Sequence, residues 1–178
     1  MNTVMTVEEI EAFVHSDYAD RDIMHNLAHI HRLQKLAQEI AISYEHDPDL
    51  LELGAYFHGN IAFKEAEIRQ FLKDKQLQQK EIDKVVQVAW ESQKESHAET
   101  MEGKILHDAH LLEGGKTFMI AKSLVTGTAR GQSLEETLQY LEEKILGKFE
   151  CCFPESQKLY AEKEEYTKLF LKDLRSNL

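Results

Sequence analysis

Apolar side chains recur along most of the chain at intervals of three and four residues, which is the period of an amphipathic helix. The clearest case runs over residues 26–44, where His29, Leu33 and Ile40 fall on one helical face and most charged side chains fall elsewhere. No segment alternates apolar and polar residues over the usual length of a strand. The pattern therefore predicts an all-α protein.

Cap and turn residues divide the rest of the chain into further helices. A capping box, in which a Ser or Thr side chain and a Glu three residues later satisfy the first turn, is predicted at Thr6 and at Ser133. Asp47-Pro48 and Pro154 predict two more helix starts, since proline is favoured in the first turn. Helices are also expected over roughly 65–75, 79–93 and 101–113, with breaks at Gly59-Asn60 and Gly114-Gly115.

Length and composition fit one globular domain over residues 1–178. A chain of 178 residues can bury a substantial core without disulfides, and 42% of its residues are apolar. The net charge of −11 disfavours a nucleic acid polymer as partner, because phosphate backbones would be repelled. A small phosphorylated molecule remains compatible, since two or three placed cations can hold it. A homo-oligomer is left open.

The ends and the cysteines suggest the compartment. The N-terminal segment lacks a cationic start followed by an apolar run, and no segment has about 20 apolar residues in a row. We therefore expect a cytoplasmic protein without a membrane span. Cys151 and Cys152 are adjacent, a spacing unsuited to an ordinary disulfide, so both are expected to be reduced.

The nine histidines are the candidate chemistry. His29 lies on the apolar face of the long predicted helix, and His25 precedes it by one turn, so both imidazoles could point into one cavity. Taken alone, His29 could equally be a hydrogen-bonded core histidine. His58 at a predicted helix end and His110 in the string KILHDAHLLE add two more candidates. Metal sites in helical bundles gather ligands from several helices in this way.

Three strings carry a resemblance to a known family. They are HNLAHIHRLQKLAQEIA, DPDLLELGAYFHGN and EGKILHDAHLLEGG, and they resemble successive motifs of the HD-domain superfamily of metal-dependent phosphohydrolases. The likeness spans roughly residues 25–133 and implies an all-α HD-type helical bundle. It also implies a divalent metal held by a His, a His-Asp pair and a distant Asp, and hydrolysis of phosphoester bonds in nucleotides or related metabolites.

Carried onto this sequence, the resemblance makes His29 the first metal ligand and His58 the histidine of the His-Asp pair. Gly59 stands where that pair has its aspartate, and His110 stands where the distant aspartate is expected. Asp108 is retained from the family string and is a candidate catalytic residue, although it lies about 200° around the helix from His110.

Losing two carboxylates changes the expected metal. His29, His58 and His110 form a three-imidazole set that favours zinc, with Mn, Ni, Co or Fe as other possibilities, and disfavours magnesium. The alternative is a degenerate site that binds no metal.

Substrate contacts complete the set of expectations. Arg32 and Lys116 are the predicted substrate-binding cations, with Lys122 and Arg130 as further candidates. His25 is a predicted catalytic residue, because an imidazole beside the metal could contact substrate or carry a proton. Two functions stay open at this point: an HD-type phosphohydrolase, and a catalytically inactive module that binds a ligand or a protein.

Overall fold

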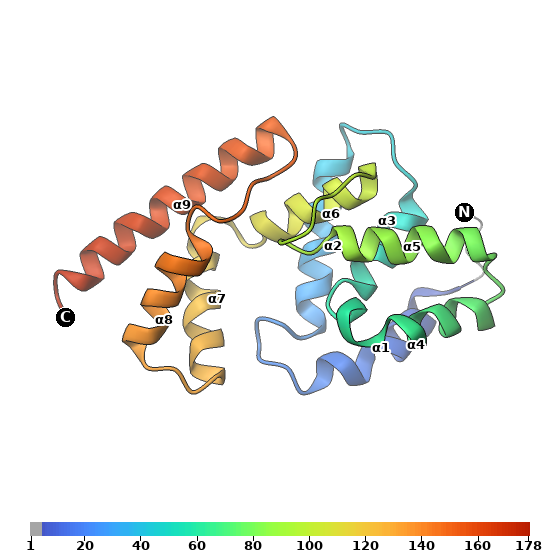
Figure 1. Cartoon of the computed structure of the whole chain (residues 1–178), viewed down its shortest axis with the longest axis horizontal. Coiled ribbons are helices and arrows are strands. Elements are labelled where there is room, and N and C mark those ends of the chain that lie inside the picture. Colours follow the sequence, from blue (N-terminus) through green and yellow to red (C-terminus); the bar gives the residue numbers. More distant parts are fainter. Residues whose placement is uncertain (1–4) are drawn as a thin grey trace.

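The computed structural model describes residues 5–178, and within that range the chain is all-helical, as the sequence predicts (Figure 1). The helices are α1 Val7–Ala19, α2 Leu27–Ala41, α3 Pro48–Phe57, α4 Ile61–Asp74, α5 Gln79–Glu91, α6 Met101–Leu112, α7 Gly115–Ala129, α8 Leu134–Tyr140 and α9 Pro154–Arg175. A short π-helical turn, η1 Leu141–Ile145, follows α8 directly.

Two groups of helices bury separate apolar clusters. The first six helices share a core in which Ile30, Phe57 and Leu106 are completely buried. The last three helices and the end of α6 enclose a smaller cluster that includes Leu138 and Leu171. Figure 1 shows α7, α8 and α9 on one side of the molecule and α1 to α5 on the other, with α6 between them. Side chains near the end of α6 can therefore reach both groups.

Most predicted helix starts are confirmed by hydrogen bonds. Both capping boxes form, and the Asp47 side chain accepts from the backbone N–H groups of Asp49 and Leu50. The expected helix start near residue 65 coincides with a kink inside α4: the helix begins with one turn at Ile61, Lys64 is non-helical (φ −132°, ψ 25°), and the regular helix continues from Glu65. The carbonyl of Asn60 accepts from the N–H groups of Phe63 and Lys64, so the turn after His58 leads straight into α4.

The Gly114-Gly115 break turns the chain from α6 into α7. Both glycines have positive φ, 72° and 71°, a region that residues with a Cβ atom rarely adopt. Glu113 is thereby held in the bend, outside both helices. Lys163 of α9 donates to the carbonyls of Leu111 and Glu113 at 3.0 and 2.7 Å, which satisfies acceptors at the end of α6.

The expectations for the two cysteines and for membrane-spanning helices agree with the structure. Cys151 and Cys152 both carry free thiols. Among residues 5–178, none of the helices is long and apolar enough to cross a membrane.

Candidate metal site and adjoining cavity

The structure brings the three predicted metal histidines together. His29 lies on α2, His58 follows the last residue of α3, and His110 lies on α6. Their ring centroids are 5.5 Å apart for His29 and His58, 6.0 Å for His29 and His110, and 4.4 Å for His58 and His110. His29 and His58 are buried, at 3% and 4% exposure. We call these residues the three-histidine cluster.

Hydrogen bonds at Nδ1 define the tautomer of two of these rings. Nδ1 of His29 lies 2.9 Å from a carboxylate oxygen of Glu113, which can only accept when ionised, so Nδ1 is the donor. Nδ1 of His110 lies 3.3 Å from the carbonyl oxygen of Ser92, which is also only an acceptor. In both neutral rings Nε2 therefore keeps its lone pair.

His58 has the same tautomer for a less direct reason. Its Nδ1 lies 2.7 Å from the hydroxyl oxygen of Ser92, and that hydroxyl donates its single proton to the carbonyl of Ala89 at 2.6 Å. The Ser92 oxygen can then accept from Nδ1 of the imidazole, while the amide nitrogen of Gln93, 3.3 Å from the same Nδ1, donates at the shorter distance of 2.7 Å to the carbonyl of His58. Metal-bound histidines usually donate the second ring N–H to an oxygen in this manner, which orients the ring. All three residues are thus prepared to act through Nε2.

The spacing of the cluster is wider than that of a closed metal site. The three residues do not offer ligand atoms that all lie within 4.8 Å of one another. In a tetrahedral zinc site, nitrogen ligands lie about 3.3 Å apart, given Zn–N bonds of about 2.0–2.1 Å. Binding of a metal would therefore require the three rings to move inward. The imidazole donors and their tautomers match those of a zinc site more closely than the distances between the rings do.

Glu113 is the electrostatic centre of the site and was missed in this role from the sequence. Its side chain is 2% exposed, and its oxygens contact His29, Arg32 and Lys122 at 2.9, 2.8 and 2.9 Å. Burial alone would raise the pKa of Glu113, but the hydrogen bonds and charges of His29 and Lys122 hold it well below its usual value. Glu113 is therefore held as a carboxylate beside Nδ1 of His29.

The place of the missing aspartate at Gly59 is filled by other side chains. A Cβ atom at Gly59 would lie 2.5 Å from the hydroxyl oxygen of Tyr18 and 3.0 Å from Nη1 of Arg21. That hydroxyl accepts from the Gly59 N–H at 3.2 Å, and Arg21 donates to the Gly59 carbonyl at 3.0 Å.

Three acidic residues, Glu65, Glu67 and Glu91, could in principle have moved into this gap. The structure places them elsewhere: Glu65 bonds Trp90, Glu67 contacts Lys64, and Glu91 bonds the start of α6 at Thr100. The site therefore has no carboxylate at the position of Gly59.

Restoring that carboxylate should destabilise the protein. We expect Gly59→Asp to cost about 1–3 kcal/mol of unfolding free energy, the usual effect of overpacking, because the new Cβ atom meets Tyr18. Adding Tyr18→Phe should recover part of the loss, since it removes the nearest atom. Urea denaturation of the two variants tests this, and an unchanged midpoint for Gly59→Asp alone would contradict it.

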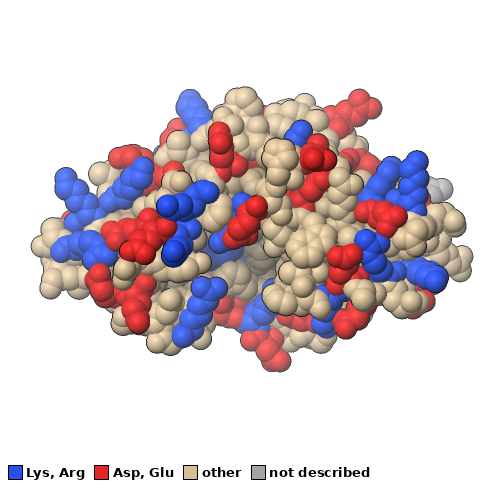
Figure 2. Space-filling model, in the orientation of Figure 1, with Lys and Arg blue, Asp and Glu red and all other residues tan. Residues whose placement is uncertain are grey.

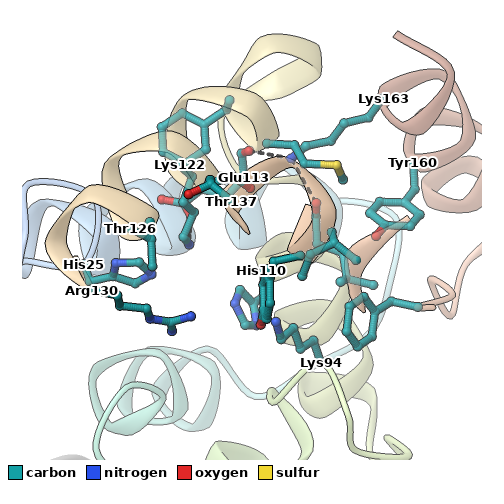
Figure 3. Close-up of a pocket in the computed structure, with 18 of the residues that line it drawn as sticks. His25, Lys94, His110, Glu113, Lys122, Thr126, Arg130, Thr137, Tyr160 and Lys163 are labelled. Atoms are coloured by element: carbon teal, nitrogen blue, oxygen red, sulfur yellow. Dashed lines mark hydrogen bonds and ion pairs between the residues drawn. The ribbon is translucent and has the colours of Figure 1, made fainter. Parts of the chain in front are cut away.

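A cavity of about 150 Å³ adjoins the cluster and is lined mainly by α6, α7, α8 and α9 (Figure 3). Four cationic side chains line it, together with one acidic side chain, Glu113, which is already paired. The cations are Lys94, Lys122, Arg130 and Lys163. In Figure 3, Arg130 and Lys94 extend toward the same space as His110. An acidic protein thus carries a locally basic cavity beside the three histidines.

On the outer surface, Lys and Arg side chains are mixed with acidic side chains, unlike those that line the cavity. In Figure 2, acidic and basic side chains alternate over the visible face, and this face is hollowed near its middle, where side chains of both charges border the hollow. No broad basic surface is visible on that face. The cavity is suited to a compact anion rather than to a polymer.

The other predicted site residues divide into two groups. His25 lines the cavity, with its ring centroid 6.1 Å from that of His29 and its Nδ1 bonded to Asp22 at 2.9 Å. Arg32 is placed behind the site, where it donates to Glu113 and to the carbonyl of Met24.

Lys116 and Asp108 are not brought to the cluster. Lys116 pairs with Glu162 on the surface at 2.9 Å and does not line the cavity. Asp108 is completely buried, and its carboxylate accepts from the backbone N–H groups of Cys152 and Phe153 at 2.6 and 3.0 Å. It anchors the segment before α9, which differs from the catalytic role expected from the sequence.

The stability of the metal-free chain should fall over two separate pH ranges as the solution is made more acidic. Burial lowers the pKa of His29, His58 and His110, and the neighbouring imidazole charge lowers it further for His58 and His110. The unfolded chain therefore binds protons first, so stability should fall as the pH drops below about 6.5, the ordinary histidine value. The lowered pKa of Glu113 adds a second loss as the pH falls below about 4.5.

The pH dependence can be measured by urea denaturation at pH 8, 6, 5 and 4 in the presence of a chelator. The midpoint should decrease at each step below pH 7. A midpoint that stays constant from pH 8 to pH 5 would contradict neutral buried histidines.

Comparison with known proteins shows similarity at the level of structure only. No family model matches the chain, and no curated protein matches its sequence. The structure of Bacillus subtilis YpgQ in complex with ADP superposes with a TM-score of 0.75 and 20% identity, covering 97% of this chain and 98% of that one. Lin1889 from Listeria innocua has a TM-score of 0.71 and 24% identity, covering 96% of both chains. The chain shares the fold of these proteins over nearly its whole length.

Proposed function

We propose that the protein is a metal-dependent phosphohydrolase of the HD type that acts on a small phosphorylated metabolite or nucleotide. The observation that carries the proposal is the cationic cavity immediately beside three histidines, two of them buried, whose Nδ1 atoms each bond an oxygen atom. A phosphate group needs cations to bind it and an electrophile to activate it. The cations of the cavity would meet the first requirement, and a metal held by the adjacent three-histidine cluster would meet the second.

The residues that would hold the metal are His29, His58 and His110, each through Nε2. Three imidazoles suit zinc, and also Mn, Co, Ni or Fe, better than they suit magnesium, which prefers oxygen ligands. When bound, such an ion polarises a phosphoryl oxygen and lowers the pKa of coordinated water. Glu113 would support His29 from behind by accepting its Nδ1 proton in a hydrogen bond.

Side chains of the cavity would bind and orient the substrate. Arg130 and Lys94 reach the space next to His110, and their charges would hold a phosphate against it. His25 would move the proton, because its Nδ1 is bonded to Asp22 and its other nitrogen is left for the cavity. Burial and the nearby Lys122 lower the pKa of His25, so it is neutral near pH 7 and able to accept a proton.

A structural neighbour gives independent support for the ligand class. The Bacillus subtilis YpgQ structure of the same fold contains ADP, a nucleotide with a diphosphate group. We extend this ligand class, a small phosphorylated molecule, to the present chain, which shares the fold at 20% identity.

The direct test is a turnover assay on the full chain purified without a histidine tag. Phosphomonoesters and nucleoside mono-, di- and triphosphates would each be incubated with Zn, Mn, Co or Ni, and phosphate or pyrophosphate release measured. Release from at least one class, suppressed by a chelator, is the expected result. No release from any substrate with any of the metals would contradict hydrolysis.

Arg130 provides a prediction about substrate binding. Arg130→Ala should raise KM about tenfold and change kcat little, because losing one charge-assisted phosphate contact costs about 1.4 kcal/mol. Lys116→Ala is the matched control: it removes a cation that α7 carries on the surface, and its KM should not change. Equal KM values for the two variants would contradict a phosphate site at Arg130.

The second candidate function is a ligand-binding module without turnover. The observation that favours it is the filling of the Gly59 position by Tyr18 and Arg21, which leaves no carboxylate at that position. Such a module would be thermally stabilised by a nucleotide, by an amount that grows with the logarithm of the nucleotide concentration above Kd, yet would release no phosphate. Stabilisation without turnover would select this function over hydrolysis.

A further inference from the structure

A second group of metal-ligating side chains lies on a different part of α6. His107 and Asp108 of α6 and Cys152 of the segment before α9 offer a nitrogen, a carboxylate oxygen and a sulfur that all lie within 4.8 Å of one another. His107 and Asp108 are buried at 4% and 0% exposure. We call this the cysteine cluster. Among residues 5–178 it is the one set of three such side chains with ligand atoms this close.

The distances in the cysteine cluster resemble those between ligands on one metal. Nδ1 of His107 lies 3.4 Å from Oδ1 of Asp108 and 3.8 Å from Sγ of Cys152. With Zn–N and Zn–O bonds of about 2.0–2.1 Å and Zn–S of about 2.3 Å, tetrahedral angles give N···O of about 3.3 Å and N···S of about 3.6 Å. An ion could thus be placed with shifts of a few tenths of an ångström.

The surrounding structure holds these ligands in place. The Asp108 carboxylate accepts from the backbone N–H groups of Cys152 and Phe153 at 2.6 and 3.0 Å, so it is oriented by the same segment that supplies the sulfur. Bonds of this kind from a neighbouring shell are typical of carboxylates that bind metals. The carboxylate still has lone pairs to donate.

The cysteine cluster is also reachable from solvent. A cavity separate from the one beside the three-histidine cluster is lined by His107, Cys151, Cys152 and the exposed His97. It gives an ion a path of entry, and water in it could complete a fourth position. Metal binding needs ligands that are held in place and a path by which the ion can enter. The buried ligands and the adjoining cavity supply these two features.

We propose that His107, Asp108 and Cys152 form a second, structural transition-metal site, selective for zinc-like ions through its nitrogen, oxygen and sulfur donors. The ion would connect α6 to the segment that begins α9 and release the thiol proton of Cys152 to solvent. It would therefore stabilise the arrangement of the last three helices, which supply most of the cationic cavity. The site does not depend on the proposed hydrolysis.

Cobalt provides the sharpest test, because a thiolate bound to Co²⁺ gives a near-ultraviolet charge-transfer absorption that imidazole and carboxylate ligands do not. The full chain, purified without a tag and kept reduced, would be titrated with Co²⁺ alone. We expect the thiolate band to saturate by two equivalents, because the three-histidine cluster would take up the second ion, and the thermal midpoint to rise. Zinc should then displace cobalt and remove the band.

Matched variants assign the band to one sulfur. Cys152→Ala should lose it, whereas Cys151→Ala, which removes the neighbouring thiol, and His58→Ala, which removes a ligand of the other cluster, should keep it. Absence of the band in the unmodified chain would overturn the proposal whatever the variants do, and so would its persistence in Cys152→Ala. Because His58→Ala bears only on the three-histidine cluster, failure of the hydrolase proposal would leave this result unaffected.

Discussion

Glu113→Ala should lower the free energy of unfolding by about 3 kcal/mol, at the low end of the usual cost of breaking a buried ion pair. The carboxylate contacts one imidazole and two cations, Arg32 and Lys122, and is 2% exposed. Its removal leaves those cations unpaired. They are 33% and 21% exposed and can turn partly toward water, which is why the low end is expected.

The same variant should also weaken metal binding about 10–100-fold, because His29 loses the acceptor that orients its ring. Urea denaturation with a chelator measures the first effect, and zinc titration measures the second. Glu162→Ala is the control, since Glu162 pairs with Lys116 on the surface and its loss should change stability little. A Glu113→Ala protein as stable as the Glu162→Ala protein would contradict the assigned role.

His58→Ala should reduce hydrolysis about a thousandfold or more, down to the rate of the metal-free chain. A bound metal contributes several kcal/mol to transition-state stabilisation, and about 1.4 kcal/mol corresponds to a factor of ten. His58 is the central member of the three-histidine cluster, since its ring centroid lies 4.4 Å from that of His110 and 5.5 Å from that of His29.

His31→Ala is the matched control for this loss. His31 lies on α2 two residues from His29 but faces outward, where it is 52% exposed and bonded to Glu11. Its replacement should leave the rate unchanged. Circular dichroism of both variants separates loss of a ligand from loss of the fold, and full activity in a folded His58→Ala protein would contradict a role for the cluster in catalysis.

Much of the fold follows from local sequence signals. The period of apolar residues identifies α2, and both capping boxes form as predicted, because caps depend on residues only three positions apart. The regular part of α4 begins after the kink at Lys64, as the sequence predicts, but the extra turn that starts at Ile61 is not indicated, because glycine and asparagine favour a break whereas Asn60 here joins His58 to a new helical turn.

The residues of the three-histidine cluster come from three separate helices. The periodicity of the sequence does not select them from the nine histidines, and the family resemblance does. The residues that contact Glu113 and Gly59 come from distant parts of the chain, and the sequence does not predict these contacts. In the sequence, Glu113 is an ordinary charged residue at a predicted helix end. Its partners, His29 of α2 and Lys122 of α7, come close to it only in the folded protein. Tyr18 fills the space beside Gly59 from 41 positions away, and nothing near Gly59 in the sequence indicates it.

Lys116 and Lys122 illustrate a similar limit within one helix. They are six residues apart on α7, so their side chains leave the helix about 120° apart. Only Lys122 faces Glu113 and the cavity, while Lys116 meets Glu162 on α9. Choosing between them requires knowing which face of α7 is turned inward, and that depends on α8 and α9.

The most direct test of the proposed site is the zinc content of two tag-free variants after reconstitution and removal of loosely bound metal. Cys152→Ala eliminates the proposed second site, and Cys152→Ala combined with His58→Ala removes a ligand of the three-histidine cluster as well. Inductively coupled plasma mass spectrometry should find about one zinc per chain in the first and none in the second. No zinc in the first, or equal zinc in both, would contradict a metal at His29, His58 and His110.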